Sequence, residues 1–92
     1  MEEEYPMPFS LEWTKEEIID VMEFFQVIEE AYEKPVRKET VLAKYRRFKQ
    51  IVPSKSEEKQ YFRDFDEKAA VSCWKTVQQA EKQEAGEAFK MI

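Results

Sequence analysis

Hydrophobic residues recur at three- and four-residue steps along most of this 92-residue chain, which is the spacing of helices with one buried face. The longest such stripe predicts a first helix over about residues 15–32. Its apolar positions are Ile18, Val21, Met22, Phe25, Ile28 and Tyr32, widened by Phe24, Val27 and Ala31. This face is broader than that of an ordinary surface helix. We therefore expect the helix to lie centrally, where it touches two or more elements or also meets a second chain.

Capping residues and prolines set the limits of the first two helices. Thr14 is a good N-cap, and Glu17 completes a capping box with it. Pro35 ends the first helix, because proline disfavours helical geometry in the residue before it. A second amphipathic stripe predicts a helix over about residues 38–52, which Pro53 stops.

Two further helices are expected in the second half of the chain. Ser54 is placed to cap a third helix over about residues 55–68, with Glu57 at the capping-box position. A fourth helix is expected over about residues 73–85, fraying toward Gly86. The residues beyond it carry no clear pattern.

The first 13 residues cannot be helical throughout, because they contain Pro6 and Pro8. Their aromatic residues fall at four-residue intervals, at Tyr5, Phe9 and Trp13. A disordered tail rarely carries so many aromatics, so we expect an extended arm laid on the core. The predicted fold is all-α: a single helical domain over residues 1–92, with four helices in a compact, mostly antiparallel arrangement and an N-terminal aromatic arm.

Composition supports helices and argues against several kinds of chemistry. The chain has one Gly and no Asn, the residues on which tight strand turns most often depend. It has no His, the commonest general base, and its single Cys73 excludes an internal disulfide and a Cys-rich zinc site. No apolar run approaches the ~20 residues of a membrane span, and the acidic N-terminus is unlike a secretory signal. We therefore expect a cytoplasmic protein that is not an enzyme and uses no cofactor or metal.

Charge is unevenly distributed along this acidic chain of net charge −5. Residues 1–33 contain eleven acidic residues and one Lys, whereas residues 34–59 contain nine basic residues and three acidic ones. The basic segment is the candidate contact for a polyanion or another partner. Its candidate residues are Lys44, Arg46, Arg47, Lys49, Lys55 and Lys59.

Helical spacing favours a plainer role for this basic segment. At about 100° per residue, Lys44 and Arg47 fall on one side of the apolar stripe of the second helix, while Arg46 and Lys49 fall on the other. Bases on both sides of a stripe are typical of side chains that snorkel beside a packed seam, and the acidic first helix is the obvious neighbour. Intramolecular charge pairing is therefore favoured over nucleic-acid binding. The bases least committed to the seam are Arg46, Lys49 and Lys55.

Two polar features have both a chemical and a structural interpretation. Residues 53–56 offer hydroxyls and free backbone N–H groups to an anion, but Glu57 would repel it, and a plain capped corner is favoured. Clustered carboxylates at Asp64, Asp66 and Glu67 do not converge on one side of a helix. Solvated surface is therefore favoured there over a cation site.

Cys73 and Trp74 are neighbours with different expectations. Cys73 has no His partner to activate it and is expected in the core. Trp74 lies to one side of the stripe of its helix. It is either an exposed interaction residue or a contact to the second helix.

A set of motifs indicates a family. They are Tyr5-Pro6, Trp13-Thr14 followed by Glu16-Glu17-Ile18, Ala31-Tyr32-Glu33-Lys34, and the run from Tyr45 to Lys59. Together they resemble the short bacterial proteins of uncharacterised protein family 0223, over about residues 5–90. Pro35 stands where that family's pattern has Gly, and Ala69-Ala70-Val71 replaces a Gly-Tyr-like corner. The resemblance implies a small all-helical domain, and it implies no activity and no catalytic or binding residues.

The leading functional interpretation is a non-enzymatic cytoplasmic interaction module. It would bind a protein partner or itself through surplus apolar surface on the first helix or the arm. The alternative is a nucleic-acid or ribosome-associated factor that uses residues 44–59. An enzyme using Asp, Glu, Lys or Tyr comes third, because none of these residues pairs convincingly. No membrane association is expected.

Overall fold

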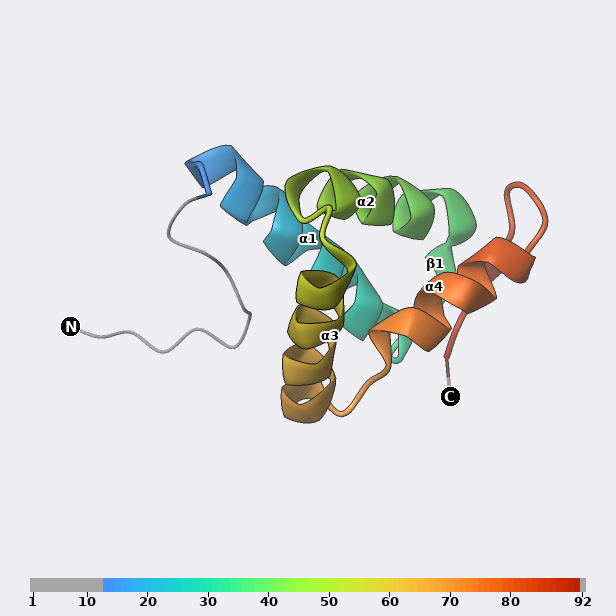
Figure 1. Cartoon of the computed structure of the whole chain (residues 1–92). Coiled ribbons are helices and arrows are strands. Elements are labelled where there is room, and N and C mark those ends of the chain that lie inside the picture. The colour runs from blue at the N-terminus through green and yellow to red at the C-terminus, as the bar shows by residue number, and fades with distance from the viewer. Residues whose placement is uncertain (1–12, 92) are drawn as a thin grey trace.

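The computed structural model describes residues 13–91, and these contain four helices joined by short connections (Figure 1). The helices are α1 (Lys15–Ala31), α2 (Lys38–Ile51), α3 (Lys55–Ala69) and α4 (Cys73–Lys82). Two short strands, β1 (Val36–Arg37) and β2 (Ala88–Phe89), complete the described part. The predicted all-α class with four helices is confirmed. Apart from Trp13, the predicted N-terminal arm lies outside the described residues.

Side-chain caps begin α1 and α3 where the sequence predicts them. Oγ1 of Thr14 accepts a 3.1 Å hydrogen bond from the backbone N–H of Glu17, and the Thr14 N–H donates to Oε1 of Glu17 at 3.0 Å. Ser54 accepts from the backbone N–H of Glu57 at 3.4 Å. Each cap satisfies a backbone donor that has no partner inside its helix.

The central helix of the fold is α1. In Figure 1, α2 runs back along α1, α3 runs down from the end of α2 at a steep angle to it, and α4 lies beside α2. The buried side chains of α1 are Val21, Phe24, Phe25, Val27, Ile28 and Ala31. Contacts with α2, α3 and α4 therefore explain the breadth of the apolar face, as expected for a central helix.

Phenylalanine rings from three helices form the main core. Phe24 of α1 stacks on Phe48 of α2 with ring centroids 5.0 Å apart, and Phe48 stacks on Phe62 of α3 at 5.6 Å. Phe25 meets Phe65 at 4.6 Å. Each such pair adds about 0.5–1.5 kcal/mol to the stabilisation from burial alone. The rings thereby fix α3 against the α1–α2 pair.

The C-terminal segment differs from the prediction. Helix α4 ends at Lys82, before the expected limit near residue 85, and the chain turns at Gly86, whose φ is +84°. Strand β2 then pairs antiparallel with β1, with Phe89 opposite Val36. A two-residue strand has too few positions to show an alternating pattern of apolar and polar residues. The sequence therefore gave no sign of this sheet, and only helices were predicted.

Side chains of α2 hold this returning segment in place. The backbone N–H of Gly86 donates a 2.6 Å hydrogen bond to Oε2 of Glu39, and this bond is the main cause that lowers the pKa of the Glu39 carboxyl. Nζ of Lys38 donates to the carbonyl of Gln83 at 2.6 Å. Phe89 is then only 7% exposed, in a second core cluster with Val27, Ala31, Val36, Val41 and Ala80.

The turn between α3 and α4 contains a strained residue. Ala70 adopts φ 58° and ψ 46°, the left-handed conformation that glycine occupies without penalty at helix ends. This is the corner where the family resemblance leads one to expect a glycine. Among the described helices, none is both long and apolar enough to cross a membrane.

Candidate functional site

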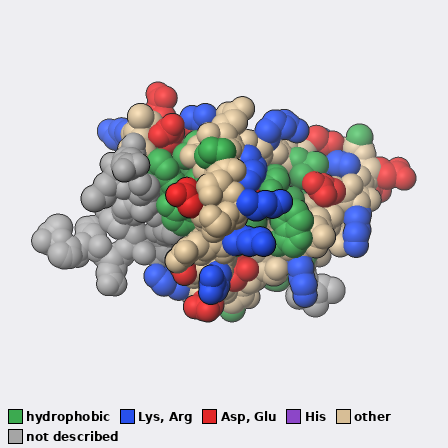
Figure 2. All heavy atoms as spheres, viewed as in Figure 1, with side chains coloured by type: hydrophobic (Ala, Val, Ile, Leu, Met, Phe, Trp, Pro, Cys, Tyr) green, Lys and Arg blue, Asp and Glu red, His purple; other side chains and the backbone are tan. Residues whose placement is uncertain are grey.

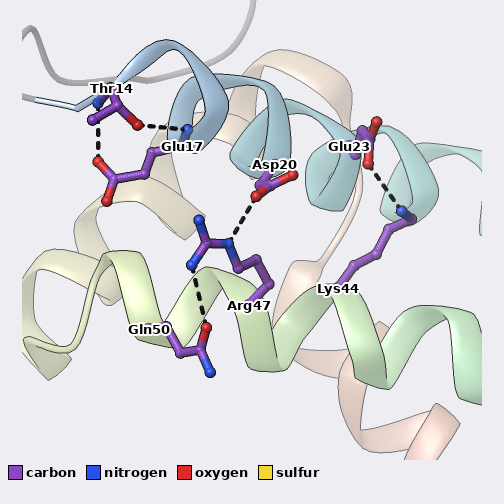
Figure 3. A network of polar contacts seen from close by, with 7 residues as sticks. All are labelled: Thr14, Glu17, Asp20, Glu23, Lys44, Arg47 and Gln50. Carbon is purple, nitrogen blue, oxygen red and sulfur yellow. Dashed lines mark hydrogen bonds and ion pairs between the residues drawn. The ribbon is translucent and has the colours of Figure 1, made fainter.

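Two of the predicted basic residues pair with the acidic first helix. Nε of Arg47 lies 2.7 Å from Oδ2 of Asp20, and Nζ of Lys44 lies 3.1 Å from Oε1 of Glu23 (Figure 3). Gln50 accepts a further 3.3 Å bond from Nη1 of Arg47. Intramolecular pairing of these two bases across the α1–α2 seam is confirmed. Both are therefore occupied within the fold.

Lys49 also has a partner, which corrects the expectation that it is uncommitted. Its Nζ lies 2.6 Å from Oε1 of Glu58, an α3 carboxylate whose residue is only 5% exposed. Tyr45 donates from its hydroxyl to the other oxygen of Glu58 at 2.8 Å. The two donors satisfy a carboxylate that would otherwise be costly to bury. Helical spacing within α2 carries no information about an acid on α3, so the sequence prediction missed it.

The remaining candidate bases lie on the surface. Arg46, Lys55 and Lys59 are exposed, and none of them forms an ion pair with another residue in the range 13–91. Lys55 and Lys59 share one side of α3 with Arg63, because residues four apart are neighbours on a helix. Of the six candidates, the structure therefore brings two together at a surface that remains open.

That surface is a groove along α3, facing the start of α4, with a volume of about 540 Å³. Most of its lining comes from α3, including the buried ring of Phe62, and α4 contributes Trp74. Its lining is Lys55, Glu58, Lys59, Phe62, Arg63, Asp66, Glu67 and Trp74. Figure 2 shows Lys and Arg side chains gathered beside an apolar patch where Figure 1 places α3 and α4. We call this surface the α3–α4 groove.

Trp74 is both exposed and in contact with the second helix, as the predicted contact to α2 requires. It is 46% exposed, and its ring also meets Tyr45 of α2 edge-on, with centroids 6.5 Å apart. Burial first, and then the hydrogen bond to Glu58, raises the pKa of the Tyr45 hydroxyl, so this donor keeps its proton at neutral pH. Tyr45 thus joins the partly buried Lys49–Glu58 pair to Trp74 in the α3–α4 groove.

The corner before α3 is a capped turn. The Ser54 hydroxyl caps the helix and lies 3.2 Å from the hydroxyl of Ser56. Both hydroxyls therefore have partners within the turn. This arrangement matches the structural interpretation favoured for residues 53–56 over an anion site.

Asp66 and Cys73 take structural positions, whereas Asp64 and Glu67 are exposed, which agrees with the solvated surface favoured for the acidic cluster. Oδ1 of Asp66 accepts a 2.9 Å hydrogen bond from the backbone N–H of Cys73, which ties α3 to the start of α4. Among residues 13–91, no group of three or more acidic or Cys side chains is arranged to hold a metal ion. Cys73 is fully buried, as predicted, and burial followed by its contact with Asp66 raises the pKa of its thiol.

The sequence carried a partial signal for this groove. The spacing of Lys55, Lys59 and Arg63 places three bases on one side of a predicted helix, and this could have been found. The position of Trp74 against that side could not, because it depends on how α4 folds back after Ala70. The predicted contacts included Lys55 and Lys59 but not Arg63.

These features define a small, mostly helical protein with an amphipathic groove between α3 and α4. Comparison with known proteins then gives its family. The model of the uncharacterised protein family UPF0223 matches residues 4–89. The chain belongs to this family, as the sequence motifs indicated.

Curated relatives match nearly the whole chain. A UPF0223 protein of Lysinibacillus sphaericus is 46% identical over 89 residues, covering 97% of this chain and 94% of the relative. One from Oceanobacillus iheyensis is 55% identical, covering 83% of this chain and 86% of its own. The UPF0223 protein YktA of Bacillus subtilis is 49% identical, with 84% and 88% covered. Their names state the family and no activity.

Proposed function

We propose that this protein is a non-enzymatic, cytoplasmic protein-interaction module and that the α3–α4 groove is its binding surface. The observation that carries the proposal is Trp74, which is 46% exposed beside Phe62 in a hollow of about 540 Å³. Half-exposed tryptophan in a concave, partly apolar surface is typical of the residues that dominate binding energy at protein interfaces.

The position of this surface differs from the initial expectation, which placed the partner on α1 or on the N-terminal arm. The apolar face of α1 is covered by the other helices, and its one large exposed hydrophobic residue among those described is Ile19. A single exposed side chain of this kind is normal for a protein surface. The groove, by contrast, combines an exposed aromatic ring, a hollow and bases that form no ion pair with another residue between positions 13 and 91.

A fixed ring supports binding better than a mobile one. Tyr45 contacts Trp74 edge-on and is itself held by Glu58, which Lys49 also binds. Side chains whose positions are set before binding lose less conformational entropy when a partner arrives. The Lys49–Glu58 pair thus supports the groove, and Glu58 is itself part of the lining.

Chemistry of the available side chains supports a non-enzymatic role. The chain contains no His, and its only Cys is buried with a raised thiol pKa, which disfavours the reactive thiolate. Glu58, the most buried carboxylate at the groove, already accepts hydrogen bonds from Tyr45 and Lys49. Its oxygens are committed to holding the fold.

Nucleic-acid binding is a second candidate because Lys55, Lys59 and Arg63 lie beside Trp74, on which a base could stack. Asp66 and Glu67 at the other end of the groove would repel a phosphate backbone. The net charge of −5 also disfavours a polyanion. A titration with single-stranded RNA at two salt concentrations tests this candidate, because phosphate contacts give a strong salt dependence.

Affinity capture from a nuclease-treated extract of the native cell tests the proposed function. The baits are the wild-type chain, Trp74→Ala and the matched Ile19→Ala, whose wild-type residue is equally exposed at 46%. We expect a protein that the wild type and Ile19→Ala retain and Trp74→Ala loses. Equal retention by all three folded baits, or loss with Ile19→Ala alone, contradicts the proposal. Circular dichroism of each bait confirms that it is folded.

A further inference from the structure

Charged residues are ordered by sign along the α3–α4 groove. Lys55 and Lys59 lie toward the N-terminal end of α3, Arg63 lies near the middle, and Asp66 and Glu67 lie toward the C-terminal end. Because the helix rises about 1.5 Å per residue, this series extends over roughly 18 Å. The groove therefore has a basic end and an acidic end.

The charges at the basic end are available to a partner. Neither Lys55, Lys59 nor Arg63 forms an ion pair within the described part of the chain. Glu58, the acid nearest to them in the lining, is neutralised by Lys49 at 2.6 Å and is almost fully buried. A ligand therefore meets uncompensated positive charge over the first two turns of α3.

Apolar surface lies between the two charged ends. Phe62 is at the base of the groove and Trp74 lies opposite α3, so an inserted apolar side chain would contact aromatic carbon on both sides. A length of roughly 18 Å accommodates five or six residues of extended peptide or about three turns of helix. Such a segment is long enough to place charges at both ends while it anchors in the middle.

This charge order distinguishes among occupants. A nucleic acid carries negative charge along its whole length and would place phosphates against Asp66 and Glu67. A protein segment can change sign along its length and match both ends. The observations therefore favour a protein segment.

We infer that the α3–α4 groove binds a short amphipathic segment of another protein, in one orientation. The segment has a large apolar anchor for Phe62 and Trp74, acidic residues for Lys55 and Lys59, and a basic residue for Asp66 and Glu67. This inference rests on the proposed function and adds the chemistry and direction of the ligand. Opposite charges at the two ends specify direction, because the reversed segment brings like charges together.

Selection from a displayed library of random twelve-residue peptides tests this inference. The full-length chain is the target, and Trp74→Ala is used to remove peptides that bind elsewhere. We expect the enriched peptides to carry an aromatic or large aliphatic residue with acids on one side and Lys or Arg on the other, in a constant order. The affinity of a chosen peptide should fall about tenfold when Lys55 and Lys59 are both changed to Glu.

Two controls show whether the loss of peptide affinity is specific to Lys55 and Lys59. Lys68→Glu with Lys75→Glu produces the same change in net charge with residues that are not in the groove lining, and should leave affinity unchanged. A peptide whose acids are replaced by Lys should regain binding to the Lys55→Glu, Lys59→Glu variant. This rescue shows that the variant is folded and that charge matching determines the preference.

The outcomes separate the inference from the proposed function. Enriched peptides that depend on Trp74 but show no charge order would overturn the inference and leave the groove as a binding surface. No Trp74-dependent peptide at all would overturn both. Salt-sensitive binding of RNA that requires Lys55 and Lys59, or a dimer in sedimentation that Trp74→Ala dissociates, would assign the groove to another occupant and overturn the inference.

Discussion

The hydroxyl of Tyr45 donates a 2.8 Å hydrogen bond to Oε2 of Glu58 and so joins α2 to α3 beside the α3–α4 groove. Glu58 is 5% exposed, and its other oxygen accepts a 2.6 Å bond from Lys49. The Tyr45 ring also contacts Trp74. Core stability and groove geometry are therefore linked through one side chain.

Replacing Lys49 by Met is expected to destabilise the protein by about 1–3 kcal/mol, because Glu58 is left buried with one donor. This range is below that of a fully buried pair, since the Lys49 side chain is 30% exposed and water screens it. Lys44→Met is the control, because its pair with Glu23 lies on the surface and should contribute less than about 1 kcal/mol. Urea unfolding at neutral pH measures both, and equal losses would contradict the distinction.

Alkaline pH is expected to weaken the fold through the buried Cys73 thiol and the partly buried Tyr45 hydroxyl. Burial raises the pKa of the Cys73 thiol above its ordinary value of 9.0, and burial with the Glu58 hydrogen bond raises that of Tyr45 above 10.0. The native state therefore holds these protons more tightly than the unfolded chain does. The stabilisation is complete below about pH 9 and is lost as the pH rises.

The substitutions Cys73→Ala and Tyr45→Phe show how much of the loss of stability at alkaline pH each of the two groups causes. Cys73→Ala should remove the part that begins above the ordinary thiol pKa of 9.0, and Tyr45→Phe the part that begins above 10.0. Unfolding free energies from about pH 7 to 11 provide the measurement, with each variant compared with the wild type at every pH. Curves that stay parallel to the wild type throughout would show that these groups do not cause the loss.

Ala70→Gly is expected to stabilise the protein by up to about 1 kcal/mol. Ala70 holds φ at 58°, where a Cβ is unfavourable, and glycine removes that strain at some cost in unfolded-state entropy. Ala69→Gly is the matched control, because it introduces glycine at the last residue of α3 and should destabilise by about 0.5–1 kcal/mol. Thermal unfolding of the two variants should therefore shift in opposite directions, and a shift in the same direction would count against strain at Ala70.

Phe89→Ala is expected to cost about 3 kcal/mol, since this ring is 7% exposed and fills the second core cluster beside Val36 and Ala80. Lys90→Ala, at the exposed neighbouring position, should change stability by less than about 0.5 kcal/mol. Denaturant unfolding compares the two. A small effect of Phe89→Ala would mean that the returning segment contributes little to the core.

Local signals were sufficient to predict the helices. The capping box of Thr14 and Glu17 and the stop at Pro53 act within a few residues, so the sequence shows them directly. The breadth of the α1 stripe likewise indicated a central position. Each of these features depends on spacing inside one element.

Features that join separate elements were missed for a physical reason. The β1–β2 pair and the Lys49–Glu58 pair both depend on where the chain returns in space. The position of Trp74 beside α3 also depends on the return of the chain. The four-residue spacing of Lys55, Lys59 and Arg63, by contrast, can be seen in the sequence. Helical periodicity identifies which side of a helix is buried, but not which other helix covers it.

Site-specific photo-crosslinking in the native cell tests the central claim, that the α3–α4 groove is a protein-binding surface, most directly. A benzophenone amino acid replaces Arg63 in the groove lining and, in a second strain, Ile19, the exposed hydrophobic residue of α1. We predict a discrete crosslinked protein from position 63 that disappears with Trp74→Ala, and none from position 19. Crosslinks to protein from position 19 alone, or from position 63 regardless of Trp74, would contradict it.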